Sequence, residues 1–117
     1  MMNLFYIFLG GGLGSLLRYS ISILIIKSHF PFATLLANFL SCIIAVLFFF
    51  LVQKTDFDND LSLFLIIGFC GGLSTFSTFS IETVSLIKEG YMSYAILNIG
   101  ISIFLCFSIL YFFFKKL

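Results

Sequence analysis

The residues whose types are best suited to binding or chemistry lie together in one segment, GFCGGLSTFSTFSIET, which covers residues 68–83. Two adjacent glycines, Gly71 and Gly72, are followed by a dense run of hydroxyl residues: Ser74, Thr75, Ser77, Thr78 and Ser80. Glycine frees the backbone and hydroxyl side chains compete for its hydrogen bonds, so we expect the helix that contains this segment to break. Where a membrane helix unwinds, its carbonyl groups become cation ligands and the new helix N-terminus offers N–H groups to anions.

Aromatic and acidic side chains follow the expected break at helical spacing. Phe76 and Phe79 share one helix face, while Thr75, Thr78 and Glu82 share another. The chain contains 18 phenylalanines, and at helical spacing in so apolar a chain most of them are expected to face lipid. The edge of an aromatic ring is nevertheless electropositive, so rings turned edge-on to a pathway could attract a small anion without a trapping charge.

Polar residues also interrupt the other apolar segments. Asn38 is costly to bury unless its amide is hydrogen-bonded, and Asn98 and Ser102 are spaced to face the same way. Arg18 ends the pattern GGGLGSLLR, and a cation at the mouth of a pathway would concentrate anions. The alternative role for these residues is to join helices, each contact contributing about 1 kcal/mol, and this is the favoured interpretation of Asn98.

Glycine pairs at a spacing of four residues predict close helix packing. Gly10 and Gly14 form one such pair, and Gly68 and Gly72 form another. Small residues at this spacing commonly let membrane helices approach each other. For either pair alone, packing is the favoured interpretation.

Composition determines the elements that must hold these residues. The chain has 117 residues, of which 62% are hydrophobic and only 9% charged. A domain of this size cannot bury so much apolar surface in its own core, so the chain must contact lipid. Segments of about 20 apolar residues, long enough to cross a bilayer, predict spans at roughly residues 4–26, 32–52, 61–87 and 91–114. We expect a solvated loop at 53–60 and a short turn at 88–90 that makes the last two spans an antiparallel hairpin.

Basic residues do not define an orientation for these spans. With both termini on one face, that face holds Lys54, Lys115 and Lys116, and the other face holds Lys27, Lys88 and Arg18. Because Lys and Arg accumulate on the cytoplasmic side, equal numbers give no bias. The balance arises either by chance in a short chain or from dual topology, in which copies insert both ways up and pair antiparallel.

Other functional classes find little support in the sequence. The net charge of +1 implies no nucleic-acid partner. Cys42, Cys70 and Cys106 are spaced for neither a zinc site nor a disulfide framework. His29 is expected in a loop without a partner, and nothing indicates an enzyme or a cleaved signal peptide.

Three segments resemble the signatures of the CrcB, or Fluc, fluoride channels. They are GGGLGSLLRY at residues 10–19, TLLANFLSC at 34–42 and GFCGGLSTFSTFSIE at 68–82. The third is the specific one, because a glycine-rich first helix alone would be a weak match. The resemblance extends over essentially the whole chain, with the same size and four-span layout.

The resemblance implies both a fold and a function. The fold is an all-α membrane protein, one four-helix domain over residues 1–117, with its third helix broken near the midplane and an antiparallel dual-topology homodimer as its assembly. The function is a passive, fluoride-selective channel with two pores, which lets cytoplasmic fluoride leave across a prokaryotic plasma (inner) membrane. A central structural sodium ion would be held by the backbone carbonyls of Gly71 and Ser74 from both subunits. The family usually has threonine where Ser74 stands, which matters little if only the main chain is used.

The resemblance also implies an anion pathway. It matches the family's paired pore phenylalanines to Phe76 and Phe79, its pore asparagine to Asn38 and its vestibule arginine to Arg18. The remaining pathway residues that it implies are Ser77, Thr78, Glu82 and Ser102.

The fourth span fits the family less closely. Asn98 stands where a tyrosine is common, and Cys106 where a small or hydroxyl residue is common. A fluoride pore must replace the ion's tightly held water with donors, whereas a bare lysine would bind it too well to let it leave. No lysine lies within a predicted span.

Two alternatives belong to other classes. A small dual-topology proton-coupled multidrug exporter also uses four short helices, but that mechanism needs a glutamate in the first span and usually a tryptophan in the last. The first span here has no carboxylate and the chain has no Trp. A non-conducting accessory membrane subunit is the other alternative, and the clustered hydroxyls and Arg18 argue against it.

Overall fold

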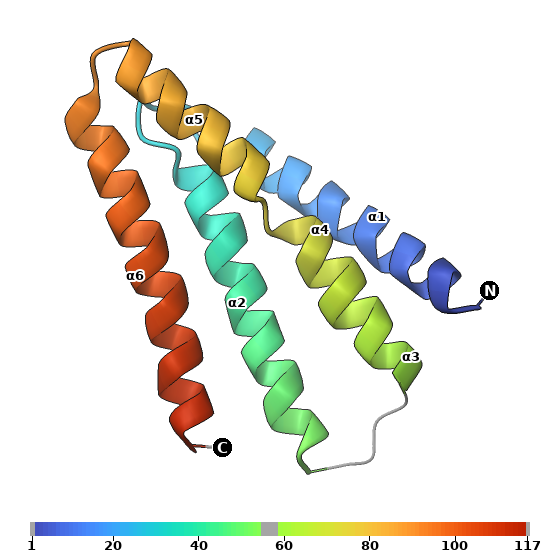
Figure 1. Ribbon diagram of the computed structural model, residues 1–117. Helices are drawn as coiled ribbons and strands as arrows, with labels where there is room; N and C mark the ends of the chain where they lie inside the picture. Colours follow the sequence, from blue (N-terminus) through green and yellow to red (C-terminus); the bar gives the residue numbers. More distant parts are fainter. Residues whose placement is uncertain (1, 55–58, 117) are drawn as a thin grey trace.

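The computed structural model describes residues 2–54 and 59–116, and all regular structure in these ranges is helical (Figure 1). The elements are α1 (Met2–Leu24), α2 (Phe32–Val52), α3 (Asn59–Ser62), the π-helical segment η1 (Leu63–Cys70), α4 (Gly71–Leu73), α5 (Phe76–Lys88) and α6 (Met92–Lys116). Residues 55–58 of the loop expected at 53–60 lie outside the described residues. The expected end of that loop is wrong, because Asn59 and Asp60 already belong to α3.

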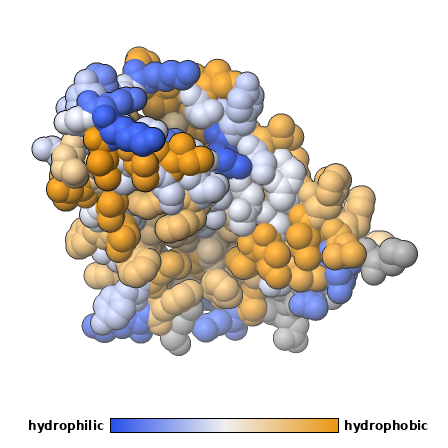
Figure 2. Space-filling model, turned by 45° about the horizontal axis from the view of Figure 1, so that its top comes forward, coloured by the Kyte–Doolittle hydropathy of each residue, from blue (hydrophilic) through white to orange (hydrophobic). Residues whose placement is uncertain are grey.

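Within the described ranges, four helical stretches are long and apolar enough to cross a membrane. They are Met2–Leu24, Phe32–Val52, Asn59–Lys88 and Met92–Phe114. Figure 2 shows hydrophilic groups gathered toward two opposite edges of the molecule, with a largely hydrophobic surface between them. The protein is therefore a multi-pass membrane protein.

Helix α1 packs closely against the stretch η1–α4, and glycines make this approach possible. A Cβ on Gly14 would overlap the carbonyl oxygen of Phe69, and a Cβ on Gly72 would overlap that of Gly11. A Cβ on Gly68 would lie only 2.9 Å from the carbonyl oxygen of Ile7. The packing interpretation of the two glycine pairs is thus confirmed. The wide π-helical turns of η1 coincide with this crossing, and π-helical turns often mark functional regions.

The turn between α5 and α6 reverses the chain direction, as the hairpin prediction requires (Figure 1). Gly90 has φ 88°, a left-handed conformation that glycine adopts without penalty. The Gly90 N–H donates to the Ile87 carbonyl at 3.2 Å and the Tyr91 N–H to the Leu86 carbonyl at 2.8 Å. This is a Schellman motif, which satisfies the last carbonyls of α5.

A small core lies where α1, α2 and α4 meet. Ala37 and Leu73 are completely buried there, with Ile21 beside them. Most large apolar side chains point outward instead; Phe8 is 78% exposed and Phe76 81%. In a membrane protein such side chains contact lipid or another subunit.

Candidate functional site

The third span changes its backbone conformation at Ser74 and Thr75. α4 ends at Leu73, Ser74 has φ −77° and ψ 153°, and Thr75 has φ −151° and ψ 121°. Both residues are extended, and helical geometry resumes at Phe76. Two glycines and two hydroxyl residues in sequence favour this local conformation.

The Asn38 amide of α2 hydrogen-bonds to the extended backbone of Thr75 in two ways. The Thr75 N–H donates to Asn38 Oδ1 at 2.7 Å, and Asn38 Nδ2 donates to the Thr75 carbonyl at 3.3 Å. One turn along α2, the Ser41 hydroxyl donates to the Cys70 carbonyl at 2.9 Å. The Ser74 hydroxyl donates to the same carbonyl at 2.8 Å. The α2 helix therefore holds both sides of the extended segment.

Two backbone carbonyls lose their helical donors in this arrangement. In a continuous helix, the Gly71 carbonyl would accept from the Thr75 N–H, and the Ser74 carbonyl from the Thr78 N–H. Here the Thr75 N–H donates to Asn38, and the Thr78 N–H donates to the Thr75 hydroxyl at 3.0 Å. The hydrogen bonds among the described residues include none to either carbonyl. These are the two carbonyls that the resemblance assigns to a cation.

A groove of about 420 Å³ lies beside this segment and gathers several of the predicted pathway residues. Asn38, Phe76, Phe79 and Ser102 line it, together with Ser74. The rings of Phe76 and Phe79 have centroids 6.0 Å apart and are tilted by 39°. Other lining residues were not predicted: Cys42, Thr75, Ile103, Cys106 and Phe107. The described lining contains no charged side chain.

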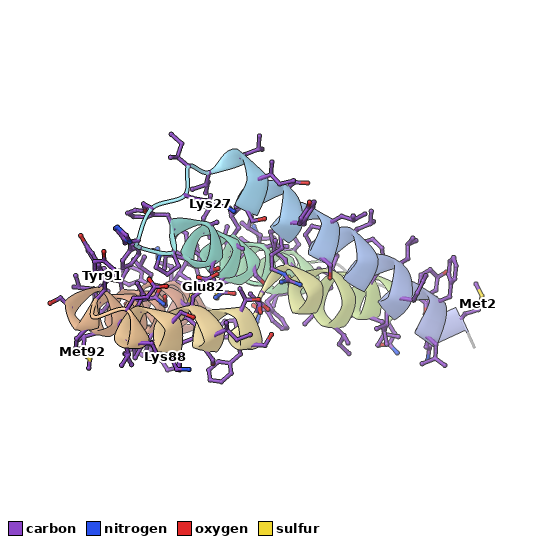
Figure 3. All side chains as sticks on the ribbon, turned by 90° about the horizontal axis from the view of Figure 1, so that it is seen from above. Met2, Lys27, Glu82, Lys88, Tyr91 and Met92 are labelled. Carbon is purple, nitrogen blue, oxygen red and sulfur yellow. The ribbon has the colours of Figure 1, made fainter. Side chains whose placement is uncertain are left out.

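Arg18, Thr78 and Glu82 line a separate cavity of about 290 Å³. Figure 3 shows Glu82 between α5 and α2, whereas Lys88, on the same helix, points away from the bundle. The Thr34 hydroxyl of α2 donates to Glu82 Oε1 at 2.7 Å, and Glu82 Oε2 is buried with no hydrogen-bond partner among the described residues. Arg18 Nε donates to the Gly72 carbonyl at 3.1 Å. Apart from Ser77, the predicted pathway residues are therefore divided between two hollows within one chain.

The cavity around Glu82 continues toward the loop between α1 and α2. An adjoining hollow of about 250 Å³ shares Thr34 and Glu82 and extends to Lys27 and His29. The expectation that His29 has no partner is wrong, because its ring stacks on Tyr91 at 4.3 Å between centroids. That contact joins two loops distant in sequence, so no local pattern indicates it.

Ser77 lines neither hollow among the lining residues described. Its side chain is exposed, and its hydroxyl lies 3.2 Å from that of Thr75. Within one chain, the structure therefore does not bring Ser77 together with the other pathway residues.

Asn98 and Ser102 belong to a polar chain between α5 and α6. Asn98 is completely buried, its Nδ2 donates to the Thr83 hydroxyl at 3.0 Å, and the Ser102 hydroxyl donates to Asn98 Oδ1 at 3.4 Å. The Thr83 hydroxyl in turn donates to the Phe79 carbonyl at 2.7 Å. The interpretation of Asn98 as a residue that joins helices is confirmed.

Sequence reasoning missed Thr34 as the partner of Glu82. One signal was present, since Thr34 precedes Asn38 by four residues and so shares its helix face. The three cysteines, each of which lies in a described helix, are all free.

Comparison with known proteins is decisive for the family. The model of the family described as "CrcB-like protein, Camphor Resistance (CrcB)" matches residues 5–113. The chain belongs to the CrcB family. Members similar to this CrcB chain include a protein of Phocaeicola vulgatus, 45% identical over 104 residues, which are 86% of each chain.

Two further relatives cover more of the CrcB chain. One from Flavobacterium psychrophilum is 42% identical over 109 residues, 90% of this chain and 88% of that protein. One from Shewanella piezotolerans is 39% identical over 114 residues, 95% of this chain and 92% of that protein. All three are named "Fluoride-specific ion channel FluC".

Proposed function

We propose that this CrcB-family chain forms a fluoride-selective channel through which cytoplasmic fluoride leaves passively. Relatives named for fluoride conduction, at 39–45% identity over most of the chain, support the proposal. The structural observation that carries it is the uncharged groove beside residues 74–75, which collects aromatic rings, an amide and hydroxyl groups. Such a lining can replace part of an anion's hydration shell without holding the anion tightly.

Asn38 supplies a hydrogen-bond donor in this channel, and the two phenylalanines supply electropositive ring edges. A primary amide has two N–H bonds, and the Thr75 carbonyl uses one of those of Asn38. The second is available to a passing anion. The electropositive edges of Phe76 and Phe79 add weak attraction along the same groove. Weak, repeated contacts favour conduction over trapping.

The cavity around Arg18 serves as the vestibule. Its guanidinium uses Nε for the Gly72 carbonyl, and the remaining N–H groups of the fork can attract an incoming anion. Thr78 lies in the same cavity and offers a hydroxyl. The Thr34 hydroxyl holds one oxygen of Glu82, which keeps this carboxylate at a defined place beside the anion path.

The working unit is an antiparallel homodimer, with the third helix broken near the bilayer midplane. Two observations support a second copy. The groove is open on one side, with Phe76 81% exposed beside it, so a single chain leaves the pathway uncovered. The balanced Lys and Arg residues permit insertion both ways up. Two copies would provide two equivalent pores in the prokaryotic plasma membrane.

The residues around Gly71 and Ser74 fit a structural sodium ion at the dimer axis. Sodium is a hard cation that prefers oxygen ligands, and the two carbonyls without donors are such ligands. A bound cation would supply positive charge that offsets the cost of removing water from the anion. The chain contributes its share by keeping these carbonyls out of helical hydrogen bonds.

Growth on fluoride tests the proposed function in cells. A bacterial strain without its own fluoride exporters is expected to tolerate a severalfold higher fluoride concentration when it expresses this chain than when it carries an empty vector. Minimal inhibitory concentrations of fluoride and of a cationic dye measure this. Unchanged fluoride tolerance, with the chain verified in the membrane, would contradict the proposal. Increased tolerance of the dye alone would favour the multidrug exporter.

A further inference from the structure

The two carbonyls assigned to sodium are available because two side chains occupy the N–H groups that would otherwise reach them. Asn38 Oδ1 accepts from the Thr75 N–H at 2.7 Å, the donor that a helix would direct to the Gly71 carbonyl. The Thr75 hydroxyl accepts from the Thr78 N–H at 3.0 Å, the donor that a helix would direct to the Ser74 carbonyl. For each of the two carbonyls, a different side chain thus accepts the N–H that would otherwise bond to it.

We propose that Asn38 and Thr75 are positioning residues for the cation site, and that they set its sodium affinity by keeping the Gly71 and Ser74 carbonyls free. The inference rests on the proposed function, because it takes the cation site of the channel as given. It adds a role for Asn38 beyond its place in the anion groove. It also assigns Thr75, for which the sequence pattern indicated no role in the pathway or the cation site, to the control of that site.

Helix energetics inside a membrane explain why these two side chains matter. A backbone N–H in hydrocarbon must find an acceptor, because no water is present to replace one. Without the Asn38 amide, the helical acceptor for the Thr75 N–H is the Gly71 carbonyl. Formation of that bond satisfies both groups and removes one cation ligand. Without the Thr75 hydroxyl, the Thr78 N–H returns to the Ser74 carbonyl for the same reason.

The α2 helix holds Asn38 firmly enough for this task. Its neighbour Ala37 is completely buried, and Ser41, one turn later, is anchored on the Cys70 carbonyl at 2.9 Å. The second hydrogen bond of Asn38, from Nδ2 to the Thr75 carbonyl at 3.3 Å, fixes the amide orientation. The acceptor of the Thr75 N–H is therefore Asn38 Oδ1, an oxygen whose position is set by α2.

Sodium titration of the purified protein tests the inference with a readout other than fluoride flux. The melting temperature is measured in detergent while NaCl replaces N-methyl-D-glucamine chloride at constant ionic strength, and the sodium midpoint is taken from the increase in stability. Asn38→Ala is expected to raise the midpoint by at least about tenfold, the usual effect of removing a group that orients a metal ligand. Thr75→Val is expected to act in the same direction.

Matched variants separate positioning from general damage. Thr75→Ser keeps the hydroxyl that accepts from the Thr78 N–H, so it is expected to retain a midpoint close to that of the wild type. Asn98→Ala removes another buried amide, which bonds to Thr83 and not to the break. It is expected to lower the melting temperature without moving the sodium midpoint.

Several results would overturn the inference. An unchanged sodium midpoint in Asn38→Ala, even with reduced fluoride flux, would restrict Asn38 to the anion groove. If that variant does not fold, an unchanged midpoint in Thr75→Val would refute the positioning role instead. A wild-type melting temperature that does not change with sodium concentration would also refute the inference. A wild type that responds to sodium and conducts no fluoride would instead refute the proposed function and leave this inference intact.

Discussion

Gly14→Ala is expected to prevent the chain from accumulating as a folded membrane protein. The added Cβ would overlap the Phe69 carbonyl oxygen and lie 2.8 Å from the Leu73 amide nitrogen. Both are backbone atoms, which cannot rotate aside as a flexible side chain can. Overpacking of an ordinary core costs about 1–3 kcal/mol, and a backbone clash belongs at or above the upper end of that range. Folded proteins retain only about 5–15 kcal/mol in total, so this loss is large.

Gly12→Ala is the matched control for this prediction. Gly12 lies on the same helix, and a Cβ there meets no atom within 4 Å. The yield of monodisperse protein from size-exclusion chromatography and its melting temperature measure both variants. We expect Gly12→Ala to match the wild type. Equal yield and melting temperature for Gly14→Ala would show that α1 does not pack against η1–α4 as described.

Phe79→Ile is expected to reduce fluoride efflux by about tenfold while leaving a folded protein. The substitution keeps an apolar side chain but removes a ring, with its electropositive edge, that lines the groove beside Phe76. A tenfold decrease corresponds to about 1.4 kcal/mol of lost stabilisation. Efflux from liposomes, followed with a fluoride electrode, measures the effect.

Phe104→Ile provides the control for ring loss in general. Phe104 lies on α6, is 70% exposed and is not among the residues that line the groove. Its replacement should leave efflux within about twofold of the wild type, because only groove rings are expected to face the anion. Wild-type efflux in Phe79→Ile would remove this ring from the pathway. An equal loss in both variants would indicate a change in the bilayer-facing surface instead.

The spans could be predicted from the sequence because a bilayer imposes one strong rule, an apolar stretch of about 20 residues. Gly90 marked the hairpin turn, and the pairs Gly10–Gly14 and Gly68–Gly72 indicated close packing. These signals are local, so they survive without knowledge of the tertiary structure. The π-helical segment η1 had no such signal, since LFLIIGFC is indistinguishable from an ordinary apolar helix by its pattern.

The partners of the polar residues could not be predicted in the same way. The sequence shows that a buried Asn38 needs a hydrogen-bond partner, but the rotation of α2 against the third span decides that the partner is Thr75. The same holds for Thr34 and Glu82, which are 48 positions apart. Motif similarity indicated Asn38 and Glu82 as candidate pathway residues, whereas the geometry shows which group each side chain contacts.

Anion efflux from liposomes is the decisive measurement for a fluoride-selective channel. The chain, purified alone, is reconstituted into liposomes loaded with potassium fluoride or potassium chloride, and valinomycin is added so that potassium can follow the anion. We expect rapid loss of fluoride, and chloride loss no faster than from protein-free liposomes. Fluoride loss at the protein-free rate, or chloride loss that keeps pace with fluoride, would contradict fluoride-selective conduction by this chain.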